Sequence, residues 1–137
     1  GELRIKGKKA NGKNWHIAIE KPYISLDGVQ AIIQVTDSGV ATSGDYRNYF
    51  EENGKRYSHT IDPRTGYPIS HNLVSATVIA DTAAKADAFS TAMMVLGPED
   101  AIDIAEENNL AVYLVIKNSN GFDVVFSKAF APFIIGE

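Results

Sequence analysis

The sequence lacks cysteine and contains no long apolar run. Without a thiol, the chain can form no disulfide framework, no thiolate zinc site and no cysteine nucleophile, so any metal would need oxygen or imidazole ligands. No segment approaches the roughly 18 consecutive apolar residues that a membrane-spanning helix needs. The chain begins at Gly1 without an initiating methionine or a signal-like segment, so we expect a processed product or an excised piece.

The net charge is small and unevenly placed. The chain has 13 Lys and Arg and 17 Asp and Glu, which gives a formal net charge of −4. The basic excess in residues 1–21 lacks the aromatic interleaving and the domain-wide extent that nucleic-acid binders show, so we expect no nucleic-acid partner. A length of 137 residues with 45% hydrophobic residues predicts one soluble domain, residues 1–137, with its own core.

Hydrophobic periodicity predicts mostly strands, interrupted once by helices. Alternating or β-branched segments predict strands at 3–6, 15–19, 29–35, 40–43, 56–60, 73–80, 110–116 and 122–126. The polar turn at 9–14 predicts that the first two strands form an antiparallel hairpin, and residues 52–55 and 117–121 are further hairpin turns. Asp81 or Thr82 can cap a helix over 83–96, and Gly97-Pro98 ends it and starts a second helix over 99–108. The predicted fold class is α+β, a mainly antiparallel sheet with an inserted helix pair.

Reactive groups are densest in residues 57–68, whose sequence is YSHTIDPRTGYP. This stretch combines the imidazole of His59, the carboxylate of Asp62 and the guanidinium of Arg64 with Ser and Thr hydroxyls and turn-forming proline and glycine. A strand that runs into a tight, solvent-exposed loop would explain the same residues without any chemistry. On this stretch alone, both interpretations stay open.

Asp87 and Thr91 lie four residues apart in the predicted helix 83–96, and therefore on one face. A carboxylate and a hydroxyl so placed could both ligate a hard cation such as Mg²⁺, and Ser90 adds a third oxygen nearby. Alternatively, Thr91 bonds back to the Asp87 carbonyl, and Asp87 is simply an exposed helix acid. The spacing by itself favours this second interpretation.

Three segments, in order, resemble the ApbE family, the FAD:protein FMN transferases once labelled thiamine biosynthesis lipoproteins. They are TSGDYR at 42–47, YSHTIDPRTGYP at 57–68 and ADAFSTA at 86–92. The opening GELR and the segment WHIAIEKP at 15–22 also resemble family segments, so the resemblance covers nearly the whole chain. It implies an ApbE or T-fold-like architecture of which this chain is the C-terminal half. The missing half would supply much of the flavin pocket and a further Mg²⁺ ligand, so we expect this piece alone to be inactive.

The reaction that the resemblance implies is Mg²⁺-dependent cleavage of the FAD pyrophosphate, with transfer of FMN to a Thr or Ser hydroxyl of a target protein. Such a reaction needs a cation at the pyrophosphate oxygens and a base near the attacking hydroxyl. By resemblance, Asp87 and Thr91 would be the Mg²⁺ ligands. His59 would be the general base, since histidine is the side chain that titrates near neutral pH.

The same resemblance gives further residues a role. Thr60 and Ile61 match positions that bind FAD, Ile61 through its backbone, whereas Asp62 and Arg64 are expected to fix the turn by pairing with each other. Many family members carry Asp where this chain has Ser90. The loss of that carboxylate would remove one charged ligand and lower metal affinity, or leave the position to water.

The other histidines and the aromatic residues have simpler explanations. We expect His16 at a sheet surface and His71 in solvent, and a zinc pair of His59 with His71 matches no standard spacing. Flavin stacking or, more simply, a layer over the core would account for Tyr46, Tyr49 and Phe50.

Alternatives to the transferase stay open. Some similar proteins are FAD pyrophosphatases that hydrolyse FAD to FMN and AMP, and a non-catalytic flavin-binding scaffold would keep the motifs for structure only. A purely structural interaction domain rests on the β-rich pattern alone. As partners, the resemblance implies FAD and flavin-carrying subunits of redox-driven pumps. It also implies a bacterial periplasmic location at the outer face of the cytoplasmic membrane, held by an N-terminal lipid anchor outside this chain.

Overall fold

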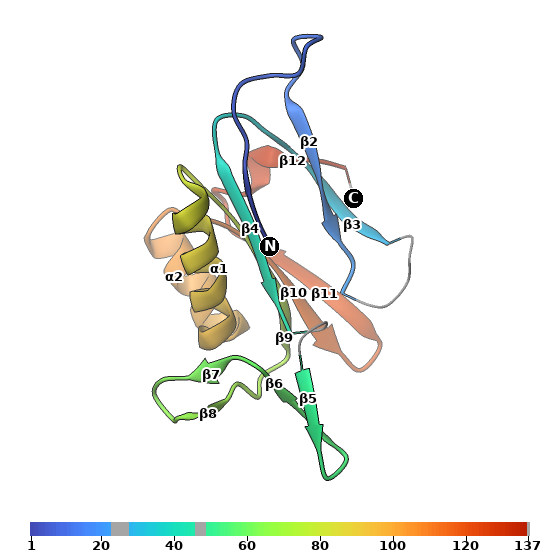
Figure 1. Cartoon of the computed structure of the whole chain (residues 1–137), viewed down its shortest axis with the longest axis vertical. Coiled ribbons are helices and arrows are strands. Elements are labelled where there is room, and N and C mark those ends of the chain that lie inside the picture. Colours follow the sequence, from blue (N-terminus) through green and yellow to red (C-terminus); the bar gives the residue numbers. More distant parts are fainter. Residues whose placement is uncertain (23–27, 46–48, 137) are drawn as a thin grey trace.

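The computed structural model describes residues 1–22, 28–45 and 49–136. Its centre is an antiparallel sheet in the order β1-β4-β9-β10-β11 (Figure 1). The bounds of these strands are Glu2–Arg4, Gly39–Gly44, Leu73–Ala80, Ala111–Asn118 and Gly121–Phe126. A smaller antiparallel sheet, in the order β12-β3-β2, is built from Ile134–Gly136, Val29–Val35 and Trp15–Glu20.

The helices and two short ribbons complete the fold. The helices are α1, α2 and a short 3₁₀ helix, with the bounds Ala83–Leu96, Pro98–Glu107 and Ala131–Phe133. The ribbons pair β5 with β6 and β7 with β8, with the bounds Tyr49–Glu52, Lys55–Ser58, Ile61–Asp62 and Tyr67–Pro68. The predicted α+β class, a mainly antiparallel sheet with an inserted helix pair, is confirmed. Within the described part of the chain, neither helix has the length and apolarity to cross a membrane.

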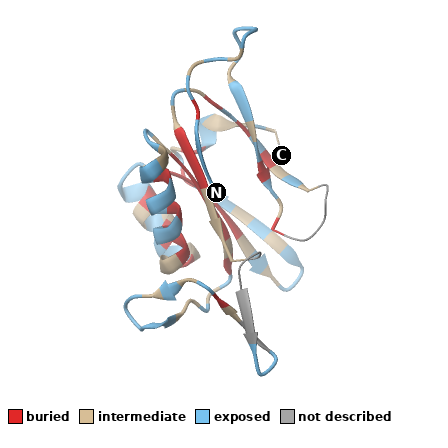
Figure 2. Ribbon diagram, viewed as in Figure 1, coloured by how far each residue is buried: buried red, intermediate tan, exposed pale blue. Residues whose placement is uncertain are grey.

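The large sheet is the middle of three layers, and a hydrophobic core lies on each of its faces (Figures 1 and 2). On one face, Met93 and Met94 of α1 and Ala101 of α2 pack against Val78 and Val112. The opposite face packs against the small sheet, with a core that includes Ile19, Ile33, Val40, Tyr113 and Phe130. Because β9 is covered on both faces, it reads as a nearly continuous apolar run rather than an alternating one.

Local signals set the ends of α1 as the sequence predicts. The side chain of Thr82 accepts a hydrogen bond from the backbone of Lys85, and the N–H of Gly97, at φ +86°, bonds to the carbonyl of Met93. The observed bounds of α1 equal the predicted ones. α2 starts at Pro98, one residue earlier than predicted, and ends one residue earlier, at Glu107.

Gly39, the first residue of β4, lies directly against the N-terminus of α1. A Cβ atom built on Gly39 would stand 2.3 Å from backbone atoms of Thr82 and Ala83. No other residue type fits here, because the obstructing atoms belong to the backbone rather than to a flexible side chain. This close approach seats α1 on β4.

Two of the predicted hairpins are confirmed and one is wrong. Asn53 and Gly54, both at positive φ, join β5 to β6, and β10 pairs with β11. Residues 3–6 and 15–19 do not pair with each other, since β1 pairs with β4 and β2 pairs with β3. The turn between them does form, with the N–H of Lys9 bonded to the carbonyl of Lys13. However, Ile5 is buried and exchanges backbone hydrogen bonds with Ser38, which draws β1 into the large sheet instead.

Candidate active site

The segment from His59 to Asn72, here called the motif loop, leaves β6 and returns to β9. Its two sides are held together by the β7–β8 pairing and by a hydrogen bond of 3.0 Å from the N–H of Ile69 to the carbonyl of Thr60. The N–H of Thr60 donates to Ser58 Oγ at 3.1 Å. His59 and Ile61 are exposed beside this anchored root. The proposed base and the proposed flavin-contacting backbone therefore lie next to each other on a fixed stem.

Asp62 and Arg64 pair as predicted. The side chain of Arg64 donates through Nε to Asp62 Oδ1 at 3.0 Å and through Nη2 to Oδ2 at 2.8 Å, and its backbone N–H donates to Oδ1 at 2.8 Å. These hydrogen bonds, the side-chain ones foremost, lower the pKa of the Asp62 carboxyl and raise that of Arg64. Gly66, at φ +75°, closes the turn onto the Asp62 carbonyl. The pair is structural, and it stiffens the tip of the motif loop.

Helix α1 places Asp87 and Thr91 on an exposed face beside β4. Thr91 Oγ1 lies 3.3 Å from Ser43 Oγ. The hydroxyl of Ser90 bonds the Asp87 carbonyl at 2.9 Å and Ser43 Oγ at 2.7 Å. Ser90, not Thr91, therefore makes the bond back to the helix carbonyl, and the hydroxyl of Thr91 points instead toward β4.

Two oxygens of this cluster suit a hard cation. The Asp87 carboxylate makes no hydrogen bond or ion pair within residues 1–22, 28–45 and 49–136, and the Thr91 hydroxyl lies one helical turn away. Ser90 is fully buried and bonded on both sides, so it is no third ligand. The described residues contain no group of three or more His, Asp or Glu that could hold a metal. Within the described residues, Asp87 and Thr91 therefore stay the two predicted ligands, and Mg²⁺ commonly completes such a set with water and substrate oxygens.

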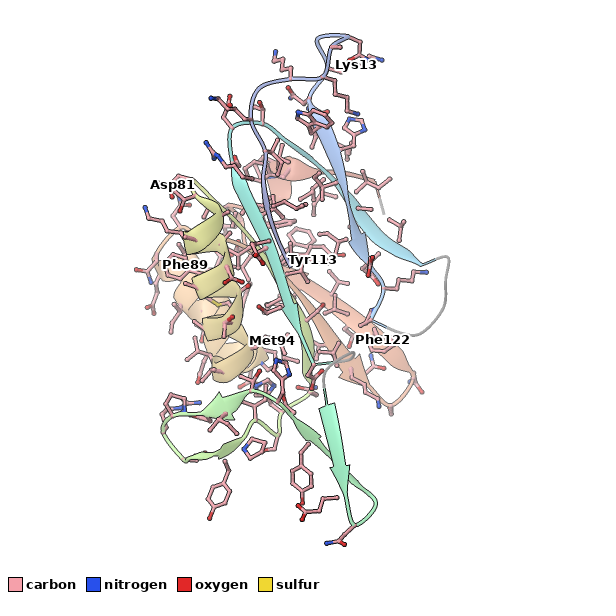
Figure 3. The ribbon with its side chains drawn as sticks, in the orientation of Figure 1. Lys13, Asp81, Phe89, Met94, Tyr113 and Phe122 are labelled. Atoms are coloured by element: carbon pink, nitrogen blue, oxygen red, sulfur yellow. The ribbon has the colours of Figure 1, made fainter. Side chains whose placement is uncertain are left out.

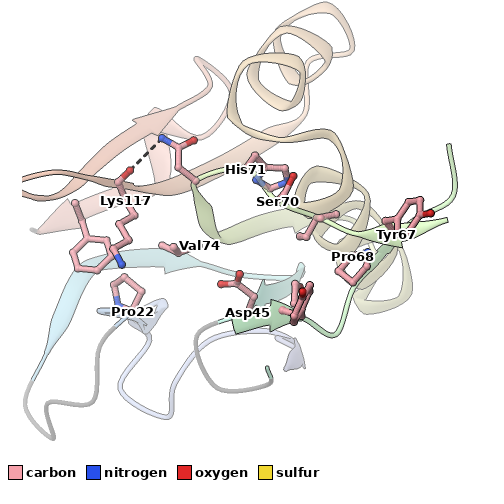
Figure 4. Close-up of a pocket in the computed structure, with 13 residues that line it drawn as sticks. Pro22, Asp45, Tyr67, Pro68, Ser70, His71, Val74 and Lys117 are labelled. Carbon is pink, nitrogen blue, oxygen red and sulfur yellow. Dashed lines mark hydrogen bonds between the residues drawn. The ribbon is translucent and has the colours of Figure 1, made fainter. Parts of the chain in front are cut away.

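A cavity of about 570 Å³ opens beside the motif loop (Figure 4). Its lining combines the aromatic residues Tyr57 and Phe122 with the charged residues Asp45 and Lys117. Asn72 closes one side, because its amide donates to the Lys117 carbonyl at 3.1 Å, the dashed line in Figure 4.

The prediction that His71 is solvated is wrong. Its Nε2 lies 2.6 Å from the carbonyl of Met94, and its Nδ1 accepts the N–H of Leu73 at 3.2 Å. Both ring nitrogens are engaged, so His71 cannot join His59 in a zinc site. His16 is exposed on β2, as predicted for a surface residue.

Both explanations of the aromatic residues, a layer over the core or flavin stacking, stay predictions. Tyr46 lies outside the described residues, and Tyr49 and Phe50 are described only through their backbone in β5.

The sequence pattern of the ApbE family matches residues 1–114. The chain belongs to the ApbE family. An ApbE relative from Haemophilus influenzae, named FAD:protein FMN transferase, is 56% identical over 131 residues, which are 95% of this chain and 38% of that protein. A protein of the same name from Escherichia coli is 47% identical over 137 residues, which are 100% of this chain and 39% of that protein.

Solved ApbE structures agree in fold. The flavinyl transferase ApbE of Pseudomonas stutzeri superposes with a TM-score of 0.82 at 47% identity, covering 97% of this chain and 41% of that one. Flavin transferase ApbE from Vibrio cholerae gives a TM-score of 0.83 at 44% identity, covering 97% of this chain and 42% of its own. The chain thus spans about two fifths of the length of these ApbE relatives.

Two residues of the site region were not assigned a role from sequence. Ser43 lies within the TSGDYR segment that helps to carry the family resemblance, yet nothing local shows that it meets α1. His71 follows the motif stretch in a polar setting, and its partner Met94 is 23 residues away.

Proposed function

We propose that the full-length protein transfers FMN from FAD to a Thr or Ser hydroxyl of a target protein in a Mg²⁺-dependent reaction. The observation that carries the proposal is the 56% identity over 95% of this chain to a protein named FAD:protein FMN transferase. The exposed Asp87 and Thr91 pair supports it, because a pyrophosphate reaction needs oxygen ligands for a cation.

In the proposed reaction, the target hydroxyl oxygen attacks the phosphorus atom on the riboflavin side of the FAD pyrophosphate. The bond between that phosphorus and the bridging oxygen breaks, AMP leaves with the bridging oxygen, and a phosphoester links FMN to the protein. His59 accepts the hydroxyl proton and passes it to the leaving group or to solvent. No oxidant or further reactant is needed.

Asp87 and Thr91 would hold the cation, with other ligands from the rest of the protein, from substrate or from water. A bound Mg²⁺ would neutralise charge that builds up on the pyrophosphate oxygens. Thr60 and Ile61 would contact the flavin through the anchored stem of the motif loop. The Asp62–Arg64 pair would keep the tip of that loop rigid while FAD binds.

The test incubates the full-length protein with FAD, Mg²⁺ and a flavin-carrying target domain, and follows the mass of the target. We expect a gain of one FMN that disappears when the cation is chelated. His59→Ala should bind FAD and lose transfer, whereas Asp87→Asn should need more Mg²⁺. The matched control is His16→Ala, an exposed histidine on β2.

Each other outcome identifies an alternative. Release of FMN and AMP without a mass gain would make the protein an FAD pyrophosphatase. FAD binding with neither transfer nor hydrolysis would make it a scaffold. Transfer that proceeds at full rate without Mg²⁺ would refute the roles of Asp87 and Thr91.

We further propose that the target is a flavin-carrying subunit of a redox-driven pump, and that the protein acts on the outer face of the bacterial cytoplasmic membrane through an N-terminal lipid anchor. This part rests on the family resemblance alone. Fractionation of cells that express the full-length protein tests it, since an anchored protein should sediment with membranes and be accessible to protease added to spheroplasts.

A further inference from the structure

The motif loop meets the end of α1 across a small hollow. The hollow has a volume of about 280 Å³, with Asp62, Arg64 and His71 on the loop side and Val95 on the helix side. Two polar contacts span this boundary. His71 Nε2 lies 2.6 Å from the Met94 carbonyl, and Arg64 Nη2 lies 3.4 Å from the Val95 carbonyl.

These contacts supply hydrogen-bond donors to the C-terminal end of α1. The last carbonyls of a helix have no partner within the helix, and the negative end of its dipole favours donors and cations. The Met93 carbonyl takes the N–H of Gly97, but the last turn of α1 has no basic residue. The carbonyls of Met94 and Val95 instead receive their donors from the motif loop (Met94 is labelled in Figure 3).

Two hydrogen bonds and one packing contact hold the His71 ring in place. A carbonyl only accepts, so Nε2 must carry the hydrogen, and Nδ1 must be bare to accept the N–H of Leu73. The Nε2–H tautomer therefore satisfies both contacts. The ring also rests against Gly97, where an added Cβ would lie 3.1 Å from His71 Cδ2.

We propose that His71 is a positioning residue that holds the motif loop, and with it His59, in a fixed place relative to the helix that carries Asp87 and Thr91. The inference rests on the proposed function. It names a residue that is neither the proposed base nor a proposed cation ligand, although it lies in the wall of the cavity beside the motif loop. His71 acts by joining the two halves of the site, the base on one side and the metal ligands on the other.

The mechanical link is short on both sides. On the loop side, His71 is two residues from Ile69, whose N–H is bonded to the carbonyl of Thr60, the neighbour of His59. On the helix side, Met94 lies three residues beyond Thr91, about 4.5 Å along the axis of a continuous helix. A shift at His71 therefore reaches both halves with little to absorb it.

The experiment compares three substitutions in the full-length protein in the FMN transfer assay. His71→Ala removes both contacts. In His71→Gln the amide nitrogen can take the place of Nε2 and donate to Met94, whereas the shorter His71→Asn can accept from Leu73 but cannot reach Met94. A misplacement of 1 Å costs about 100-fold in rate. We therefore expect His71→Ala and His71→Asn to lose about that factor in kcat, with the KM for FAD changed less than roughly threefold.

His71→Gln should retain kcat within about fivefold of wild type, because it restores the donor to the helix end. His16→Ala should be unchanged. Rates are divided by the folded fraction, measured by near-ultraviolet circular dichroism, so that lost stability is not counted as lost positioning.

The outcomes separate the two proposals. Wild-type protein that transfers no FMN refutes the proposed function itself. Active wild type with an unchanged kcat in His71→Ala overturns the positioning role alone. Equal rates per folded molecule in His71→Gln and His71→Asn also overturn it, since the contact with Met94 would then not matter.

Discussion

Replacing Gly39 with alanine tests how tightly the candidate site depends on the seating of α1. The new Cβ would stand 2.3 Å from backbone atoms of Thr82 and Ala83, about 1 Å short of the 3.4 Å at which ordinary contact begins. Backbone cannot rotate away, so α1 or β4 must move by about that distance. Overpacking of this kind costs roughly 3 kcal/mol, the upper part of its usual range.

The same displacement of α1 should also lower the rate of FMN transfer. Asp87 lies in the second turn of α1 and would move with the helix, and a 1 Å misplacement costs about 100-fold in rate. Urea denaturation of the full-length protein measures the loss of stability as a lower midpoint at unchanged slope. The FMN transfer assay, run without urea where the variant is folded, measures the loss of kcat.

The matched control is Gly136→Ala in β12, where the new Cβ would meet Ile32 at an ordinary 3.9 Å. It should stay within about 0.5 kcal/mol of wild type. If Gly39→Ala were as stable and as active as Gly136→Ala, the close packing of α1 on β4 would be refuted, and with it the claim that this contact positions Asp87 and Thr91, the proposed metal ligands.

Three further predictions follow from single contacts. Asp62→Asn should lower the free energy of unfolding by an amount that is constant at neutral pH and shrinks as pH falls. The reason is that folding lowers the pKa of Asp62. The stability that the carboxylate contributes is therefore complete above the unfolded-state pKa of about 3.9, and it is lost as pH falls through the folded-state pKa. Thr91→Val, which keeps shape and removes the hydroxyl, should raise the Mg²⁺ concentration for half-maximal transfer roughly tenfold. Ser127→Ala should lower the free energy of unfolding by about 1–3 kcal/mol, since the buried Ser127 hydroxyl accepts the N–H of Val112 at 3.0 Å and donates to the Leu110 carbonyl at 2.6 Å.

Each has its control. The control for Asp62 is Asp81→Asn, because Lys85, at the start of α1, lowers the pKa of the Asp81 carboxyl. This variant should show the same pH trend in stability without slower FMN transfer. A loss of stability in Asp62→Asn that did not vary with pH would contradict the link between the Asp62 pKa and folding. Thr91→Ser should keep the wild-type Mg²⁺ response, and equal responses in Thr91→Val would remove Thr91 from the cation. Ser119→Ala, on an exposed turn, should be neutral within about 0.5 kcal/mol, and a neutral Ser127→Ala would show that the two backbone groups find other partners.

Sequence predicted those parts of the structure whose causes are local. The bounds of α1 follow from a cap at Thr82 and a glycine at Gly97, both adjacent to the helix. The Asp62–Arg64 pair joins residues two apart, and the shared face of Asp87 and Thr91 follows from helical spacing. Each of these needed only a few neighbouring residues to be decided.

Contacts between distant segments could not be predicted. The turn at Gly12 favours a hairpin of residues 3–6 with 15–19. Burial of Ile5 and pairing of β1 with β4 are more favourable, and both depend on strands far away in the sequence. The polar neighbours of His71 suggest solvent, while its real partner is the Met94 carbonyl on α1. Ser43 likewise meets its hydroxyl partners 47 and 48 residues further on.

The length of α1 sets where Asp87 lies relative to His71. The chain enters β9 beside His71, and its eight residues carry it about 26 Å at strand spacing. α1 then runs back across the same sheet for 14 residues, about 21 Å, and its last turn meets His71, two residues before the strand begins. One inserted residue before Asp87 would turn its carboxylate by about 100° around the axis, and one after Thr91 would carry the helix end past His71. An insertion or deletion between β9 and the end of α1 would therefore change how Asp87 lies relative to His71.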